Sequence, residues 1–115
     1  MKKVFLPATV IALSIFLVNC HGPKQAASVP VAALTYEGDV KEVISQNCSP
    51  CHISTKGKMK PYDNYANTSA DIDEIIRRIQ LNPGDRGFMP FKHPKLPDST
   101  IAIFTKWKDQ GRVEK

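Results

Sequence analysis

The stretch Cys48-Ser49-Pro50-Cys51-His52 decides how this sequence is interpreted. Two thiols separated by two residues are followed at once by an imidazole, all within about one helical turn. Apolar residues at helical spacing precede the motif over residues 39–47, so we expect it to follow a helix. The chain has 115 residues, of which 42% are hydrophobic, which is enough for one small domain. Because a chain of this length forms only a thin core, we expect an additional stabilising feature such as a disulfide, a metal or a buried cofactor.

The spacing C-x-x-C-H is typical of covalent haem attachment. Cys48 and Cys51 can add to the two vinyl groups of one haem as thioethers, and His52 then becomes the proximal iron ligand. Three other interpretations compete: a redox dithiol, one half of a zinc site, and chance. A thioredoxin-like dithiol needs a βαβ context, which this sequence does not show. A zinc site needs a second pair of ligands, and the only cysteines after residue 35 are Cys48 and Cys51. We therefore expect one covalently bound haem c, with its iron.

A haem in a cytochrome usually has a sixth ligand, and the folded part offers Met59, Met89 and His93 for that position. Met89 lies 37 positions after His52 with a predicted helix between them, which is enough chain to reach the opposite face of a haem. Met59 follows His52 by only seven positions and would have difficulty crossing. We predict Met89 as the distal ligand, and His93, more simply a surface residue, stays as the alternative.

Three amphipathic helical patterns and no strand alternation predict an all-α domain with long loops. The patterns cover residues 39–47, 71–81 and 99–110, and a short helical turn fits residues 64–67. Asp39 and Glu42 have the spacing of a capping box at the start of the first helix. Asn82-Pro83-Gly84 ends the second. Asp98 is a suitable N-cap for the third, and Gly111 is its natural stop.

The first 19 residues have the composition of an export signal. Lys2 and Lys3 precede an apolar stretch over residues 4–18, which is too short to be read first as a membrane span. The stretch ends in Leu17-Val18-Asn19-Cys20, which resembles the lipobox of bacterial lipoproteins, except that Asn19 stands where a small residue is usual. The resemblance implies a lipid on Cys20 after cleavage. An ordinary cleaved signal and an uncleaved anchor are the alternatives, and all three export the domain.

These features divide the chain into three expected parts: residues 1–19 as a signal peptide, residues 20–35 as a lipidated cysteine and flexible tether, and residues 36–115 as the folded domain. Prolines and small residues without a sustained period favour the tether. The formal net charge of +5 includes two lysines that leave with the signal peptide. No run of basic residues interleaved with aromatic residues is present, so we expect no nucleic-acid partner.

From about Gly38 to Gly111 the sequence resembles a class I (mono-haem) c-type cytochrome domain. The resemblance rests on a helix that enters C-x-x-C-H, a helix that ends in Arg-Ile before a Met-Pro loop, and a last helix that carries an aromatic residue. It implies that Cys48 and Cys51 are the thioether positions. It also implies that His52 and Met89 are the two axial ligands of one haem.

The resemblance also implies a fold, with about three main helices wrapped around the haem. The first and last helices would cross near it, bringing together Val40, Val43, Ile44, Phe104 and Trp107. A proline carbonyl would accept a hydrogen bond from the second nitrogen of His52, and Pro61 is the nearest candidate. Ile53 replaces the glycine that often follows the motif in this family.

The expected function is one-electron transfer between redox proteins on the periplasmic side of the membrane, not enzymatic catalysis. One alternative is a haem-c subunit or accessory module of a larger respiratory complex, and another is a haem-based sensor or enzyme with a labile sixth ligand. A basic loop is either an ordinary solvated loop or a docking surface for an acidic partner. Arginine or tyrosine side chains fit the haem propionates. The loop residues are Lys56, Lys58 and Lys60, and the propionate candidates are Tyr62, Tyr65, Arg77 and Arg78.

Overall fold

The computed structural model describes residues 32–115. The predicted signal peptide, the predicted lipidation site at Cys20 and the tether up to residue 31 lie outside the described residues. Within residues 32–115 the chain is helical and contains no strand, in agreement with the all-α prediction. None of the helices described is long and apolar enough to cross a membrane.

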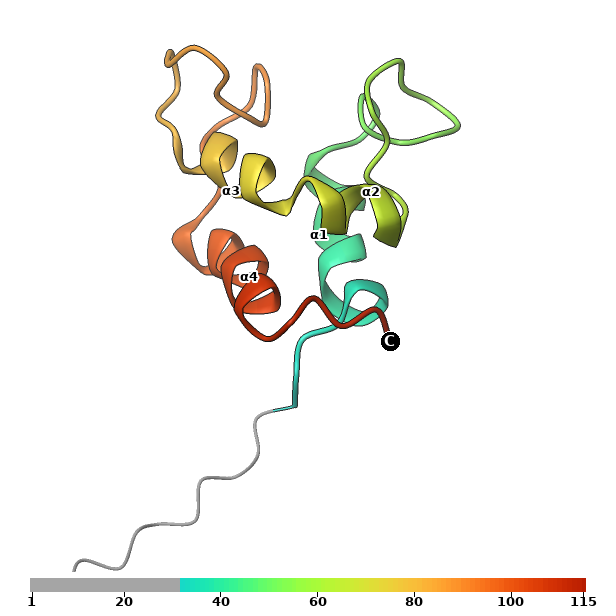
Figure 1. Ribbon diagram of the computed structural model, residues 1–115. Helices are drawn as coiled ribbons and strands as arrows, with labels where there is room; N and C mark the ends of the chain where they lie inside the picture. The colour runs from blue at the N-terminus through green and yellow to red at the C-terminus, as the bar shows by residue number, and fades with distance from the viewer. Residues whose placement is uncertain (1–31) are drawn as a thin grey trace, which may run out of the picture. The chain divides into compact units, whose positions relative to one another are not determined.

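Five helical segments follow one another along the described part of the chain (Figure 1). They are the π-helical η1 (Tyr36–Val40), α1 (Lys41–Asn47), α2 (Tyr65–Ala70), α3 (Ile72–Gln80) and α4 (Asp98–Asp109). Two long loops, 48–64 and 81–97, connect α1 to α2 and α3 to α4. Both loops project from the same side of the helices in Figure 1. The C-x-x-C-H motif begins the first loop and Met89 lies in the second, so both predicted halves of the site are on this side.

The first helix starts earlier than predicted and is capped differently. The side chain of Thr35 accepts a hydrogen bond from the amide of Gly38 at 3.0 Å, and the Asp39 carboxylate accepts one from the amide of Thr35 at 2.8 Å. Thr35 and Asp39 thus form a reciprocal cap, in which each side chain accepts from a backbone amide near the helix start. The predicted capping box of Asp39 with Glu42 is therefore wrong. Glu42 instead accepts a hydrogen bond from the side chain of Gln46.

The ends of the last helix match the prediction only in part. Asp98 is the first residue of α4 and not its N-cap, a position held by Pro97 without a side-chain hydrogen bond. The Asp98 carboxylate still lies in the first turn, where the helix dipole favours an anion. Gly111 follows the helix with a φ of 95°, and its amide donates to the carbonyl of Lys108 at 3.1 Å. The predicted glycine stop is confirmed, because this left-handed conformation favours a residue without Cβ.

The middle of the domain consists of two short helices in succession. Asn64 caps α2 by accepting a hydrogen bond from the amide of Asn67 at 2.9 Å, so the predicted turn at 64–67 is the start of a helix. In α3, the isoleucines with the predicted helical spacing face inward, and Ile72, Ile75 and Ile79 are buried. The second predicted helix is thus confirmed to within one residue at each end.

The core takes one face from every helix except α2, together with one residue of the second loop. It consists of Tyr36, Val40, Val43, Ile44, Ile72, Ile75, Ile79, Leu96, Ile101, Phe104 and Trp107. The predicted packing of the first helical region on the last is found in this cluster, although within that region it is η1, more than α1, that contacts α4. Helix α3 also packs on α4. The fully buried rings of Tyr36 and Trp107 have centroids 6.1 Å apart.

The residues after α4 fasten the start of the domain to its last helix. The Val113 carbonyl accepts hydrogen bonds from the amide of Tyr36 at 2.9 Å and from the indole N–H of Trp107 at 2.8 Å. Leu34 packs against the core, and its amide donates to the side chain of Gln110 at 2.8 Å. Within the described residues, contacts with the domain thus reach back to Leu34. The segment that leads into η1 leaves the helices on the side away from the two loops (Figure 1).

Candidate functional site

The C-x-x-C-H motif continues the end of α1 as a tight turn. Cys48 is the C-cap residue of α1, and its amide donates to the Ile44 carbonyl at 2.8 Å. The amide of His52 donates to the Cys48 carbonyl at 3.0 Å, which closes a backbone turn over the motif. Both thiols are free, Cys48 half-buried against the core and Cys51 exposed.

The imidazole of His52 is fixed through one of its two nitrogens. Nδ1 lies 2.7 Å from the carbonyl oxygen of Lys60. Because a carbonyl can only accept, Nδ1 carries the proton, and in the neutral ring the lone pair is then on Nε2, the arrangement typical of a metal-binding histidine. The predicted acceptor, the carbonyl of Pro61, is wrong by one residue. That carbonyl instead accepts a hydrogen bond from the side chain of Asn67 at 3.0 Å.

Tyr62 covers one face of this imidazole. The two rings are nearly parallel, at an angle of 16°, with centroids 4.8 Å apart. The amide of Tyr62 also donates to the carbonyl of His52 at 2.8 Å. The Tyr62 hydroxyl donates to the Asp71 carboxylate at 3.2 Å. Burial, with the nearby charge of Asp71, raises the pKa of Tyr62 to about 12, so the phenol stays protonated at neutral pH.

The loop between His52 and Tyr62 closes tightly on the motif. The amide of Met59 donates to the Cys51 carbonyl at 3.3 Å. The Asp63 carboxylate accepts from both the amide and the hydroxyl of Ser54, at 3.0 and 2.6 Å. These bonds, the hydroxyl first, lower the pKa of Asp63. Met59 itself is 55% exposed and belongs to the same loop as Cys51, so the structure gives no support to a role for it on the opposite side of a haem.

Met89 lies in the other loop, where its side chain is sheltered. It is half-buried and packs against the core, and its neighbours Phe88 and Pro90 are both buried. Its amide donates to the Arg78 carbonyl at 3.3 Å, which ties this part of the loop to the end of α3. Met89 also contributes to the wall of a cavity of about 440 Å³ along residues 83–93. The predicted distal ligand is therefore held inward, on the loop that faces the same way as the motif.

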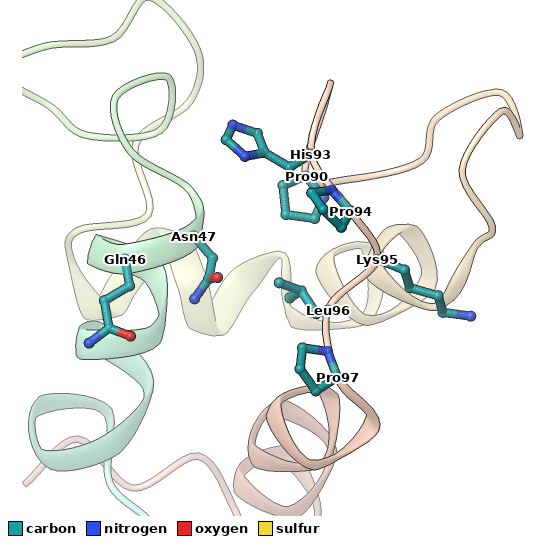
Figure 2. A pocket seen from close by; sticks show the side chains of 8 residues that line it. All are labelled: Gln46, Asn47, Pro90, His93, Pro94, Lys95, Leu96 and Pro97. Atoms are coloured by element: carbon teal, nitrogen blue, oxygen red, sulfur yellow. The ribbon is translucent and has the colours of Figure 1, made fainter.

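His93, the alternative ligand, is exposed. It lines a second cavity, of about 220 Å³, between the end of α1 and residues 90–97 (Figure 2). The other walls include Gln46, Asn47 and Leu96. In Figure 2 the His93 ring projects from its segment while Leu96 points into the space between that segment and α1. Since His93 lacks the core packing that holds Met89, the burial pattern favours Met89.

The environment of Cys48 differs from that of a reactive dithiol. Burial raises the pKa of the Cys48 thiol to about 11. The thiol is also at the C-terminal end of α1, where the helix dipole disfavours an anion. Reactive C-x-x-C thiols need the opposite environment, which stabilises the thiolate. Within residues 32–115, no group of three or more His, Cys, Asp or Glu side chains is placed to hold a metal ion alone, so the zinc interpretation gains no support.

The residues predicted to bind haem propionates all have protein partners. The Tyr65 hydroxyl donates to the Arg112 carbonyl at 3.0 Å, beside the C-terminal segment. Arg77 and Arg78 both donate to Glu74, at 2.7 and 2.6 Å for their Nε atoms. These hydrogen bonds, that of Arg77 first, lower the pKa of Glu74 to about 2.

Of the three lysines in the predicted basic loop, one is paired, and the other two form no ion pair with another residue among 32–115. Lys56 and Lys58 are exposed. Lys60 forms an ion pair with Asp71 at 2.8 Å. Its side chain therefore belongs to the surroundings of His52, while the two other lysines remain available for a charged partner.

Sequence reasoning missed three contributors to this site. They are the Lys60 carbonyl, the Asp71 carboxylate and Gly57, whose amide donates to the Ile53 carbonyl at 2.8 Å. Gly57 is the one glycine between Cys48 and Asn64. A single glycine in a loop often marks a tight turn, so the sequence did contain a signal for it. The other two contacts join residues eight and eleven positions apart through a loop, so no periodicity reveals them.

Comparison of the chain with protein-family models, curated proteins and solved structures finds no match. The assignment of a function therefore rests on the residues and their geometry.

Proposed function

We propose that this chain carries one covalently attached haem c and transfers single electrons between redox proteins outside the cytoplasmic membrane. The proposal rests on the geometry of the C-x-x-C-H motif. Two free thiols close the end of α1, and the imidazole that follows has its Nδ1 held by a backbone carbonyl at 2.7 Å. A bound haem would supply an iron that cycles between the ferric and ferrous states.

Four residues would hold the group. Cys48 and Cys51 would form the thioethers, and His52 would bind the iron through Nε2. Met89 would be the distal ligand, since its side chain is sheltered in the second loop. A histidine and methionine pair fills both axial positions and raises the reduction potential, which suits an electron carrier better than a sensor or an enzyme.

The surroundings of the motif fit an apolar prosthetic group. Several half-buried side chains pack against the core without being enclosed by it, namely Cys48, Ile53, Tyr62 and Met89. They come from both loops on one side of the helices. A haem there would extend a thin core, as expected for a domain of this size. We assign the arrangement, with η1 packed on α4, to a class I cytochrome c-like fold.

The proposed location rests on the sequence alone. Residues 1–19 would direct export and be removed, and a lipid on Cys20 would hold the protein at the periplasmic side of a membrane. Residues 21–33 would then connect the lipid to the domain, since Leu34 already packs against the core and Thr35 caps η1.

The test is covalent attachment in the full chain, produced in a host that attaches haem in its periplasm. We expect the protein mass to increase by one haem, and the haem to stay bound after extraction with acidified organic solvent. The double variant Cys48→Ala/Cys51→Ala should lose it. Cys20→Ala is the matched control, because it should keep the haem and leave the membrane fraction. A wild-type chain without covalent haem would overturn the proposal.

A further inference from the structure

Residues 60–62 contact His52 on two sides. The Lys60 carbonyl accepts the Nδ1 proton at 2.7 Å, and the Tyr62 ring stacks on the imidazole with centroids 4.8 Å apart. The Tyr62 amide also binds the His52 carbonyl at 2.8 Å. The position of this short segment therefore determines both the orientation of the ring and the strength of its Nδ1 hydrogen bond.

Asp71 holds the same segment through the side chains of Lys60 and Tyr62. One of its carboxylate oxygens, Oδ2, accepts from the ammonium of Lys60 at 2.8 Å and from the hydroxyl of Tyr62 at 3.2 Å. A single atom thus fastens the residues on both sides of Pro61. The Lys60 hydrogen bond, with that of Tyr62, lowers the pKa of Asp71, so the carboxylate is charged at neutral pH.

The backbone of Asp71 is itself held firmly. It is the C-cap of α2, and its amide donates to the Asn67 carbonyl at 3.1 Å. Its own carbonyl accepts from the Ile75 amide at 2.9 Å in the first turn of α3. The carboxylate is therefore attached to a helix junction, whereas the segment that it holds is a loop.

We infer that Asp71 is a positioning residue for the His52 imidazole, acting through Lys60 and Tyr62. The inference rests on the proposed function and adds to it a determinant of the iron potential. A strong Nδ1 hydrogen bond makes the imidazole a better electron donor, which favours ferric iron. Releasing residues 60–62 would weaken that bond and let the ring turn, and the reduction potential would rise.

If the ion pair of Asp71 with Lys60 were merely structural, its loss would not reach His52. Exposed ion pairs contribute little to stability, and the Asp71 and Lys60 side chains are 28% and 48% exposed. Asp73 provides a matched control, because it forms an ion pair with Lys108 of α4 and, among the described residues, no hydrogen bond or ion pair with residues 60–62. Removing either carboxylate costs one ion pair, but only the loss of Asp71 should reach His52.

The experiment compares Asp71→Asn, Asp71→Glu and Asp73→Asn in the haem-loaded full chain. The readouts are the reduction potential and the paramagnetically shifted NMR signals of the His52 ring protons. We expect Asp71→Asn to raise the reduction potential and to move the His52 ring signals. Asp71→Glu keeps a carboxylate, so its potential and ring signals should lie close to those of the wild type. Asp73→Asn should leave both readouts near wild type. Tyr62→Phe, which removes one of the two bonds to Asp71, should give a smaller shift in the same direction.

Two outcomes would overturn the inference, and they are distinguishable. If the haem is attached but Asp71→Asn changes the potential and the His52 signals no more than Asp73→Asn does, Asp71 has no positioning role and the proposed function stands. If the wild-type chain carries no covalent haem, the proposed function and this inference fall together.

Discussion

Gly57 packs directly on the backbone of Cys51. A Cβ on Gly57 would lie 1.8 Å from the Cys51 carbonyl oxygen and 2.4 Å from its carbonyl carbon. These atoms belong to the motif itself and cannot move aside as a flexible side chain can. The loop that brings Lys60 to His52 therefore closes only because residue 57 has no side chain.

Gly57→Ala should open this loop. We expect a loss of folding free energy of about 1–3 kcal/mol, because backbone must shift to admit the methyl group. We also expect a sharp fall in the fraction of protein that carries haem, since the His52 contact with Lys60 depends on the same loop. Thr55→Ala, an exposed position on the loop, is the control. Urea unfolding and haem content of the two variants provide the measurement, and equal values for both would contradict the close contact.

Met89→Ala should free the sixth coordination position of the haem-loaded protein. Carbon monoxide should then bind the ferrous form rapidly, and the reduction potential should fall, because a thioether ligand raises it. Met59→Ala removes the same side chain from an exposed position and should do neither. His93→Ala tests the alternative ligand. Carbon monoxide binding to His93→Ala and not to Met89→Ala would transfer the distal role to His93.

The two motif thiols should differ in reactivity before haem attachment. Cys51 is exposed, whereas burial raises the pKa of Cys48 to about 11. Because the thiolate is the reactive form, iodoacetamide should label Cys51 first near neutral pH, and the rate at Cys48 should increase as the pH rises toward 11. Mass spectrometry of the peptides measures both rates. The difference should disappear in urea, and its absence in buffer would contradict the burial of Cys48.

The ion pairs of Glu74 should weaken in acid. Hydrogen bonds from Arg77 and Arg78 lower the pKa of Glu74 from 4.5 to about 2. A lowered pKa in the folded state stabilises the fold above the unfolded value, and that stabilisation is lost as the pH falls from about 4.5 toward 2.

The melting temperatures of wild type and Glu74→Gln should therefore differ by a small, constant amount above about pH 5 and converge below it. Gln80→Ala, an exposed and uncharged position on α3, should differ from wild type equally at all pH values. A Glu74→Gln difference that does not change with pH would show that the ion pairs contribute nothing.

The helices were predictable where apolar residues repeat at helical spacing. The isoleucines of α3 predicted that helix to within one residue at each end, because Ile72, Ile75 and Ile79 all face the core. Helix starts were less predictable. Asp39 and Glu42 have the spacing of a capping box, yet the fully buried Tyr36 draws the helix start back to Thr35. Tertiary burial thus outweighed a local capping signal.

The candidate site was predictable in its residue types but not in its supporting contacts. The motif spacing identified Cys48, Cys51 and His52, and the roles assigned to them and to Met89 stay predictions. The carbonyl that holds His52 belongs to Lys60 and not to Pro61, because loop geometry decides which carbonyl faces the ring and every residue has one. The contact of Asp71 with Lys60 spans eleven positions and joins a loop to a helix junction, which no local pattern encodes.

The most direct test of the central claim is the absorption spectrum of the full-length protein, oxidised and reduced, with and without carbon monoxide. The proposed function predicts a haem c spectrum that is low-spin when reduced and unchanged by the gas, since His52 and Met89 would fill both axial positions. Rapid carbon monoxide binding by the unaltered protein would contradict a closed electron-transfer site and favour a sensor or an enzyme. A protein without a haem spectrum would contradict the assignment altogether.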